Sequence, residues 1–132
     1  MPQQETLAPI AGPAAWRGAD MARSEEWIHV LAPAEVSAIE DLVARLRDSS
    51  RAPLGALEPA VGAWRETLAR GRGFLLVRGF PIERLGVEGA MLGYWAIGLH
   101  LGTPVPQNLA GELLTDVRDT GADPGDPSTR LY

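Results

Sequence analysis

The hydrophobic positions of the chain form one short unbroken run between segments of helical periodicity. The run occupies residues 74–77, with Gly71 and Gly73 before it and Gly79 and Pro81 after it. Glycine and proline interrupt regular structure, so they limit the run to a single short element. Because no polar residue alternates with the apolar ones, the run predicts a buried strand that is covered on both faces.

Three helices are expected around this strand. The first, at residues 33–48, starts with Pro33, whose missing N–H costs nothing in a first helical turn. The second covers residues 57–68, and Gly71 is expected to end it in a left-handed conformation. The third covers about residues 87–101 and is followed by glycine and proline.

The third helix contains large side chains at helical spacing, namely Met91, Tyr94 and Trp95. Such a stripe is more often core packing than a ligand site, so we expect these side chains in the core. Further strands are expected at residues 26–31, which are rich in β-branched and aromatic side chains, and at residues 112–118. Strands and helices together predict a mixed α/β fold.

The first part of the chain lacks periodicity. Prolines and glycines recur in residues 1–24, which are therefore expected to form an irregular N-terminal arm before a domain at residues 25–132. Trp16 is the expected anchor of this arm, because tryptophan has a large apolar surface to bury. Turn signals predict a loop at residues 119–130, and residues 131–132 resemble the start of another strand.

Composition restricts the possible partners. The chain has 132 residues, 45% of them hydrophobic, which suits one globular domain. The net charge is -5, and the 12 basic residues are arginines spread along the sequence, so nucleic acid is not an expected partner. No cysteine is present, which excludes disulfides and thiolate metal sites. Residues 86–101 are too short an apolar segment to span a membrane, and we expect no membrane contact and a cytoplasmic location.

Chemistry-bearing residues do not form a recognisable active site. Glu26 and His29 have the spacing found in di-iron bundles, but that architecture needs two such pairs and two further glutamates on four facing helices. Only one pair exists, so His29 is expected to be an ordinary strand residue. His100 is expected to cap a helix C-terminus or to lie on the surface. Neither histidine belongs to a His-x-Asp pair, and the chain has no Gly-x-Ser-x-Gly motif.

The order of several segments is more informative. Residues 71–81 read Gly-Arg-Gly-Phe-Leu-Leu-Val-Arg-Gly-Phe-Pro, residues 94–105 end in Leu-Gly-Thr-Pro-Val, Gln107 and Asn108 follow, and residues 111–118 read Gly-Glu-Leu-Leu-Thr-Asp-Val-Arg. This combination resembles the TauD/TfdA-type dioxygenases, which use Fe(II) and 2-oxoglutarate to activate oxygen and hydroxylate a substrate carbon. The resemblance is strongest over residues 71–118.

The resemblance implies that the chain holds the N-terminal helices and first strands of a double-stranded β-helix, a jelly roll of the clavaminate synthase type, in incomplete form. The His-x-Asp pair, distant histidine and arginine of that family would all lie beyond Tyr132. No catalytic or metal-binding residue can therefore be assigned, and this chain alone is not expected to bind Fe(II) or 2-oxoglutarate. Gln107 and Asn108 resemble residues that border the substrate pocket, although polar residues between prolines are also ordinary loop.

Two functions remain open. The first is the N-terminal part of a dioxygenase that hydroxylates a small organic substrate, inactive alone. The second is a non-catalytic remnant that acts as an interaction module through apolar surface, which can also lead to homo-oligomers. A His-x-Asp pair encoded shortly after Tyr132 would favour the first function, and a stop codon there would favour the second.

Overall fold

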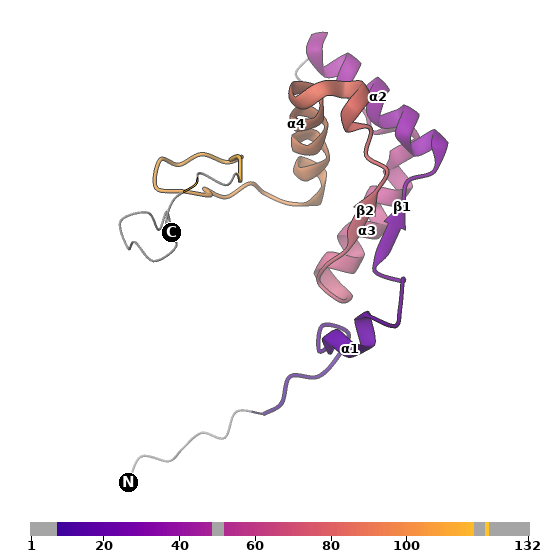
Figure 1. Ribbon diagram of the computed structural model, residues 1–132, viewed down its shortest axis with the longest axis vertical. Helices are drawn as coiled ribbons and strands as arrows, with labels where there is room; N and C mark the ends of the chain where they lie inside the picture. Colours follow the sequence, from indigo (N-terminus) through magenta and orange to yellow (C-terminus); the bar gives the residue numbers. More distant parts are fainter. Residues whose placement is uncertain (1–7, 49–51, 118–120, 122–132) are drawn as a thin grey trace.

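The computed structural model describes residues 8–48, 52–117 and 121. Four α-helices, one 3₁₀ helix and two strands occur in this part of the chain (Figure 1). In chain order they are α1 (Gly18–Met21), β1 (Ile28–Val30), α2 (Pro33–Asp48), η1 (Gly55–Leu57), α3 (Glu58–Arg70), β2 (Leu76–Arg78) and α4 (Ile82–Leu101).

The two strands form a parallel pair that lies against a layer of helices. β1 pairs with β2 so that His29 is opposite Val77. Helix α2 packs against α4 and η1, and α3 packs against α4. The chain leaves β1 through α2 and returns to β2 through α3, which is the crossover that a parallel pair requires.

The core lies between the helices and one face of the strand pair. Its buried residues come mainly from α2, from η1 with α3, and from α4: Leu31, Ile39, Leu42, Leu54, Leu57, Ala60, Val61, Trp64, Ala96 and Ile97. Half-buried Leu75 and Val77 pack against this cluster from β2 and the residue before it. The predicted helices at residues 33–48 and 57–68 are confirmed, the second as η1 followed by α3. Each buries most of the face that its apolar spacing indicated, although Leu68 is 37% exposed.

The strand at residues 76–78 is shorter and less covered than predicted. Phe74 and Leu75 precede it rather than belong to it. On the face away from the helices, Leu76 is 39% exposed and Val30 of the neighbouring strand is 67% exposed. The expectation of a strand buried on both faces is therefore wrong for the described residues, because the helices cover only one side of a two-stranded sheet.

Two glycines explain how the chain turns around these elements. Gly71 follows α3 with φ -97°, so the predicted left-handed cap is wrong there, and the positive φ of +84° occurs at Gly73 instead. Gly86, with φ +68° and ψ 175°, interrupts α4 after its first turn. The predicted third helix at residues 87–101 corresponds to the longer part of α4 after this kink.

The predicted strand at residues 112–118 is not observed in its described part, residues 112–117, which contain a bend and irregular backbone. Figure 1 shows residues 102–117 leaving the helical layer after α4. Residue 118, the predicted loop at 119–130 apart from Gly121, and the predicted strand start at 131–132 lie outside the described residues.

The N-terminal arm is attached to the rest of the chain through Trp16, as predicted. The indole Nε1 donates a hydrogen bond to the carbonyl of Arg72 at 3.1 Å, and the ring packs edge-on against Phe74 with centroids 4.8 Å apart. The short helix α1 lies within the arm and was not predicted. None of the helices in the described ranges has both the length and the apolar character that a membrane crossing requires.

Candidate functional site

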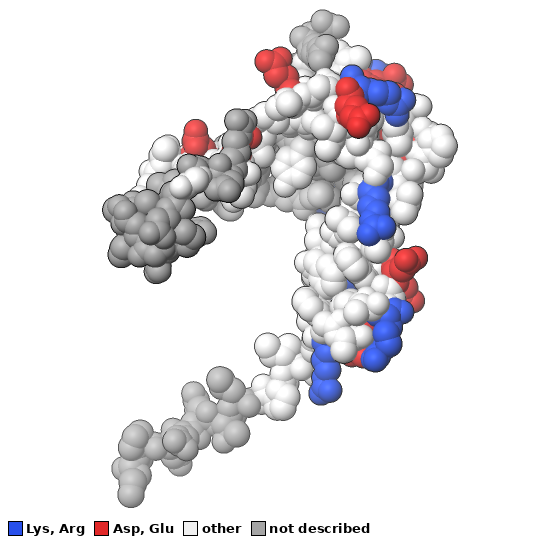
Figure 2. All heavy atoms as spheres, in the orientation of Figure 1, with Lys and Arg blue, Asp and Glu red and all other residues white. Residues whose placement is uncertain are grey.

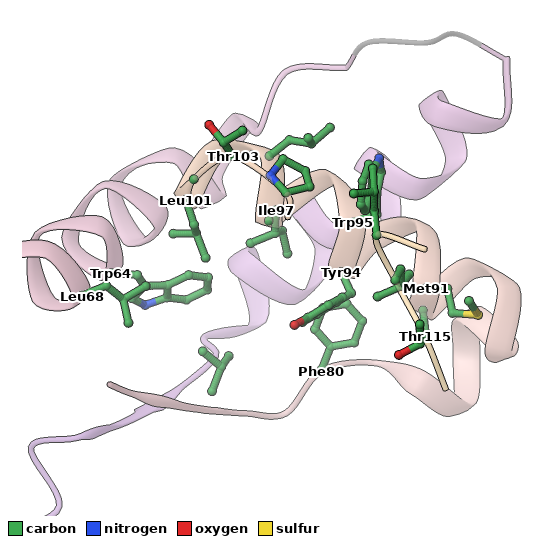
Figure 3. A pocket seen from close by; sticks show the side chains of 18 of the residues that line it. Trp64, Leu68, Phe80, Met91, Tyr94, Trp95, Ile97, Leu101, Thr103 and Thr115 are labelled. Atoms are coloured by element: carbon green, nitrogen blue, oxygen red, sulfur yellow. The ribbon is translucent and has the colours of Figure 1, made fainter. Parts of the chain in front are cut away.

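An open cavity of about 760 Å³ lies beside β2, and we call it the apolar groove. Its lining combines residues of α3, of β2 and its flanks, of α4 and of the segment after α4: Trp64, Leu68, Leu75, Val77, Phe80, Ile82, Ala90, Met91, Tyr94, Trp95, Ile97, Gly98, Leu99, Leu101, Gly102, Thr103, Pro104, Leu113, Leu114, Thr115 and Asp116. Figure 3 shows Trp64 and Leu68 toward one end of this groove and Met91, Trp95 and Thr115 toward the other.

The large side chains of α4 face the groove rather than the core. Tyr94 is 65% exposed and Met91 is 40% exposed, while Trp95 is half-buried. The expectation that these three residues pack in the core is therefore wrong. The groove could have been suspected from sequence, because α4 is apolar around most of its circumference, and such a helix needs cover on more than one side.

Small residues occupy the face of α4 that packs in the core. Gly93 is the closest contact point: a Cβ atom added there would lie 3.1 Å from Cγ2 of Val43 and 3.2 Å from Cζ of Phe80. Gly89 and Ala96 are also buried. These small residues let α2 approach α4 closely. Ile97 is the large side chain among the buried residues of α4, whereas Met91, Tyr94 and Trp95 line the groove.

Trp64 joins the core to the groove. Its side chain is 5% exposed and lines the groove wall, and its indole Nε1 is buried with no hydrogen-bond partner among the described residues. The ring also meets the His29 imidazole edge-on, with centroids 5.1 Å apart. A buried N–H without an acceptor is uncommon and costs stability, so Trp64 presents an unsatisfied donor at the groove wall.

His29 forms a structural link between β1 and α2. Its Nε2 lies 3.0 Å from Oε2 of Glu35, and the same oxygen accepts a hydrogen bond from the backbone N–H of Ala32 at 2.8 Å. Burial raises the pKa of Glu35, but the Ala32 hydrogen bond, the His29 hydrogen bond and the His29 charge outweigh burial and lower the pKa below its ordinary value. An ionised carboxylate only accepts hydrogen bonds, so Nε2 of His29 is the donor.

Glu26 and His29 do not form a metal-binding pair. His29 bonds to Glu35, whereas Oε2 of Glu26 lies 3.9 Å from Nη2 of Arg72. No group of three or more His, Cys, Asp or Glu side chains that could hold a metal ion occurs among residues 8–48, 52–117 and 121. His100 is exposed in the last turn of α4, one of the two positions expected for it.

Gln107 and Asn108, the candidate substrate-binding residues, lie in an exposed turn after α4. The amide of Gln107 donates to the carbonyl of Val105 at 2.8 Å. Asn108 Oδ1 accepts hydrogen bonds from the backbone N–H groups of Ala110 and Glu112, and its Nδ2 donates to the carboxylate of Glu112. Neither residue lines the apolar groove. Their role in substrate binding stays a prediction.

The polar residues at the margin of the groove were not identified from sequence. They are Thr103, Thr115 and Asp116, from the segment that follows α4. Their positions depend on how this segment folds back toward Met91 and Trp95, which local sequence patterns do not describe. The groove thus combines an apolar wall with a few polar groups, the usual make-up of a binding surface.

Comparison with known proteins gives one informative similarity. No family model matches the chain. The chain is 30% identical over 122 residues to a protein named FR-33289 synthase from Streptomyces rubellomurinus (strain ATCC 31215), a match that includes 86% of this chain and 36% of that protein. The chain therefore spans about a third of the length of the curated relative that it matches.

Proposed function

We propose that this chain is the N-terminal part of an Fe(II)/2-oxoglutarate-dependent dioxygenase that hydroxylates a small organic substrate. The observation that supports this proposal most is the similarity to FR-33289 synthase over 86% of the chain. That protein is named a synthase, which is an enzyme, and residues 71–118 of this chain resemble the TauD/TfdA-type dioxygenases.

Fe(II) does not fit the described residues. No group of three potential ligands occurs among them, and the Glu35 carboxylate beside His29 already accepts a hydrogen bond from the backbone N–H of Ala32. In the proposed enzyme, iron and 2-oxoglutarate are held by polypeptide other than this chain. The chain supplies a helical layer, the apolar groove and the turn with Gln107 and Asn108, which we propose borders the substrate pocket.

A chimera tests this proposal. The matched third of FR-33289 synthase is replaced by this chain, and oxygen uptake is measured with and without Fe(II) and 2-oxoglutarate. We expect the parent enzyme and the chimera to consume oxygen only when Fe(II) and 2-oxoglutarate are present together. A folded, monodisperse chimera without 2-oxoglutarate-dependent oxygen uptake, beside an active parent, contradicts the proposal.

The second candidate, a non-catalytic interaction module, is favoured by the exposure of the apolar groove. Tyr94, Met91 and Leu99 of α4 are all at least 40% exposed, and contiguous exposed apolar surface marks protein contacts. In Figure 2, uncharged atoms form most of the inner side of the molecule, and the charged side chains gather mainly on the opposite side. Stable partner binding by a chimera without oxygen uptake would favour this candidate.

A further inference from the structure

The turn at residues 107–112 is closed by two backbone hydrogen bonds. The N–H of Gln107 donates to the carbonyl of Glu112 at 2.7 Å, and the N–H of Gly111 donates to the carbonyl of Asn108 at 3.1 Å. Gly111 has a φ of +79°, a conformation that glycine adopts without strain and that lets the chain reverse here. The backbone of Gln107 is therefore held directly beside that of Glu112.

Most of the bonding capacity of the Asn108 side chain is used inside this turn. Its Oδ1 accepts hydrogen bonds from the backbone N–H groups of Ala110 at 3.0 Å and Glu112 at 3.2 Å, and its Nδ2 donates to the Glu112 carboxylate. Because only an oxygen can accept from two N–H groups, these bonds fix the orientation of the amide. An asparagine amide has two acceptor sites and two donor hydrogens, so a single hydrogen on Nδ2 remains for another molecule.

The side chain of Gln107 has the opposite character. Its Nε2 donates one hydrogen bond, to the carbonyl of Val105 at 2.8 Å. Within the described part of the chain, no group donates a hydrogen bond to its Oε1. Gln107 is also exposed, so its side-chain carbonyl can accept a hydrogen bond from another molecule.

We propose that Asn108 is a positioning residue, which holds the turn through Oδ1, and that Gln107 is the residue of the pair that contacts the substrate. The inference rests on the proposed function, in which this turn borders the substrate pocket. It also names a substrate class: a small organic molecule that donates an N–H or O–H hydrogen bond to Oε1 of Gln107. Residues 113–116, which directly follow the turn, line the apolar groove, so the turn adjoins the polar margin of the groove.

Two variants of Asn108 in the chain alone test its hold on the turn. Asn108→Asp keeps an oxygen that can accept both backbone bonds but lacks the Nδ2 hydrogens, and Asn108→Ala lacks both groups. We expect the amides of Ala110 and Glu112 to exchange about tenfold faster in Asn108→Ala and at nearly the wild-type rate in Asn108→Asp. Asn108 is exposed, so neither variant should disturb the core.

The same variants in the chimera with FR-33289 synthase test the effect on the substrate. Oxygen uptake with Fe(II) and 2-oxoglutarate present gives the KM of the chimera for the substrate of its parent enzyme. We expect Asn108→Ala to raise this KM by about tenfold and Asn108→Asp to leave it within about twofold. Gln107→Met removes the acceptor at similar size and should raise KM by about tenfold without changing exchange in the turn, whereas Gln107→Glu keeps an acceptor and should preserve KM.

The possible results separate this inference from the proposed function. A raised KM in Asn108→Asp with an intact turn would assign the remaining Nδ2 hydrogen to the substrate and overturn the positioning role, as would wild-type exchange in Asn108→Ala. Equal KM values for Gln107→Met and the wild type overturn the contact, and equal losses in Gln107→Met and Gln107→Glu overturn the substrate class. Faster exchange in Asn108→Ala beside a chimera without oxygen uptake supports the hold on the turn and refutes the dioxygenase. Oxygen uptake with the same KM in every variant does the reverse.

Discussion

Replacing Glu35 by glutamine should weaken the junction between β1 and α2. Oε2 of Glu35 accepts hydrogen bonds from the backbone N–H of Ala32 and from the imidazole of His29, at 2.8 and 3.0 Å. The side chain of Glu35 is 16% exposed, so water competes little for these contacts. Glutamine keeps an amide oxygen that can accept both bonds, but it removes the charge.

The loss of stability can be calculated from the two hydrogen bonds whose acceptor changes from a charged to a neutral group. A hydrogen bond to a charged group contributes about 1.5–3 kcal/mol and a neutral one about 0.5–1.5 kcal/mol, so each bond loses about 1 kcal/mol. A carboxylate in the first turn of a helix also stabilises the helix dipole. We therefore expect Glu35→Gln to lower the free energy of unfolding by about 1–2 kcal/mol at pH 7.

The effect of Glu35→Gln should depend on pH in a defined direction. The pKa of Glu35 is lowered in the folded protein, so the ionised form stabilises the fold at any pH above the pKa of the unfolded chain, about 4.3. This contribution is lost as the pH falls through the folded pKa of Glu35. The difference in stability between the wild type and Glu35→Gln should therefore shrink below about pH 5 and disappear at lower pH.

Urea unfolding followed by tryptophan fluorescence between pH 7 and pH 3 measures this difference. Glu40→Gln is the matched control on the same helix, because Glu40 forms an ion pair of 2.9 Å with Arg84, whose side chain is 64% exposed. An exposed pair of this kind contributes about 0.2–1 kcal/mol, so the control should change stability less. Equal stability of Glu35→Gln and wild type at pH 7, or a difference that persists unchanged to pH 3, would refute the role given to Glu35.

Three further predictions test other parts of the structure. Gly98→Ala has open space for its Cβ in α4 and should stabilise the protein by about 0.5–1 kcal/mol. Gly93→Val should destabilise the protein, because even a Cβ at this position would lie 3.1 Å from Val43 and 3.2 Å from Phe80. Thermal unfolding compares the two variants, and equal effects on stability would contradict the packing described around Gly93. Trp16→Ala should release the arm and speed its limited proteolysis while leaving the thermal midpoint nearly unchanged, with cleavage at the wild-type rate as the contrary result. Isothermal titration calorimetry of the chain alone should show no more binding of Fe(II) and 2-oxoglutarate than a control protein, and stoichiometric binding would contradict this.

Local patterns in the sequence were sufficient for the elements whose causes are local. Pro33 marks the start of α2, and the apolar spacing of residues 57–68 defines the face of α3 that is buried. Both signals depend on residues within a few turns of one another. The anchoring role of Trp16 was also predictable, because its size alone argues against full exposure.

The errors concern contacts between distant segments. The helical spacing of Met91, Tyr94 and Trp95 is real, but spacing does not reveal which side of α4 the core occupies, and that depends on the close approach of α2 at Gly93. The left-handed turn occurs at Gly73 instead of Gly71 because either glycine permits it, and tertiary packing selects between them.

The error about β2 is the most informative, because the sequence signal for a two-sided cover is strong and the observed cover is one-sided. Parallel strands are normally buried on both faces, yet Val30 and Leu76 are 67% and 39% exposed on the outer face. Among the described residues, β2 also has no strand beside its other edge, and the apolar groove next to it is open. The helices described here therefore do not by themselves account for the apolar run at residues 74–77.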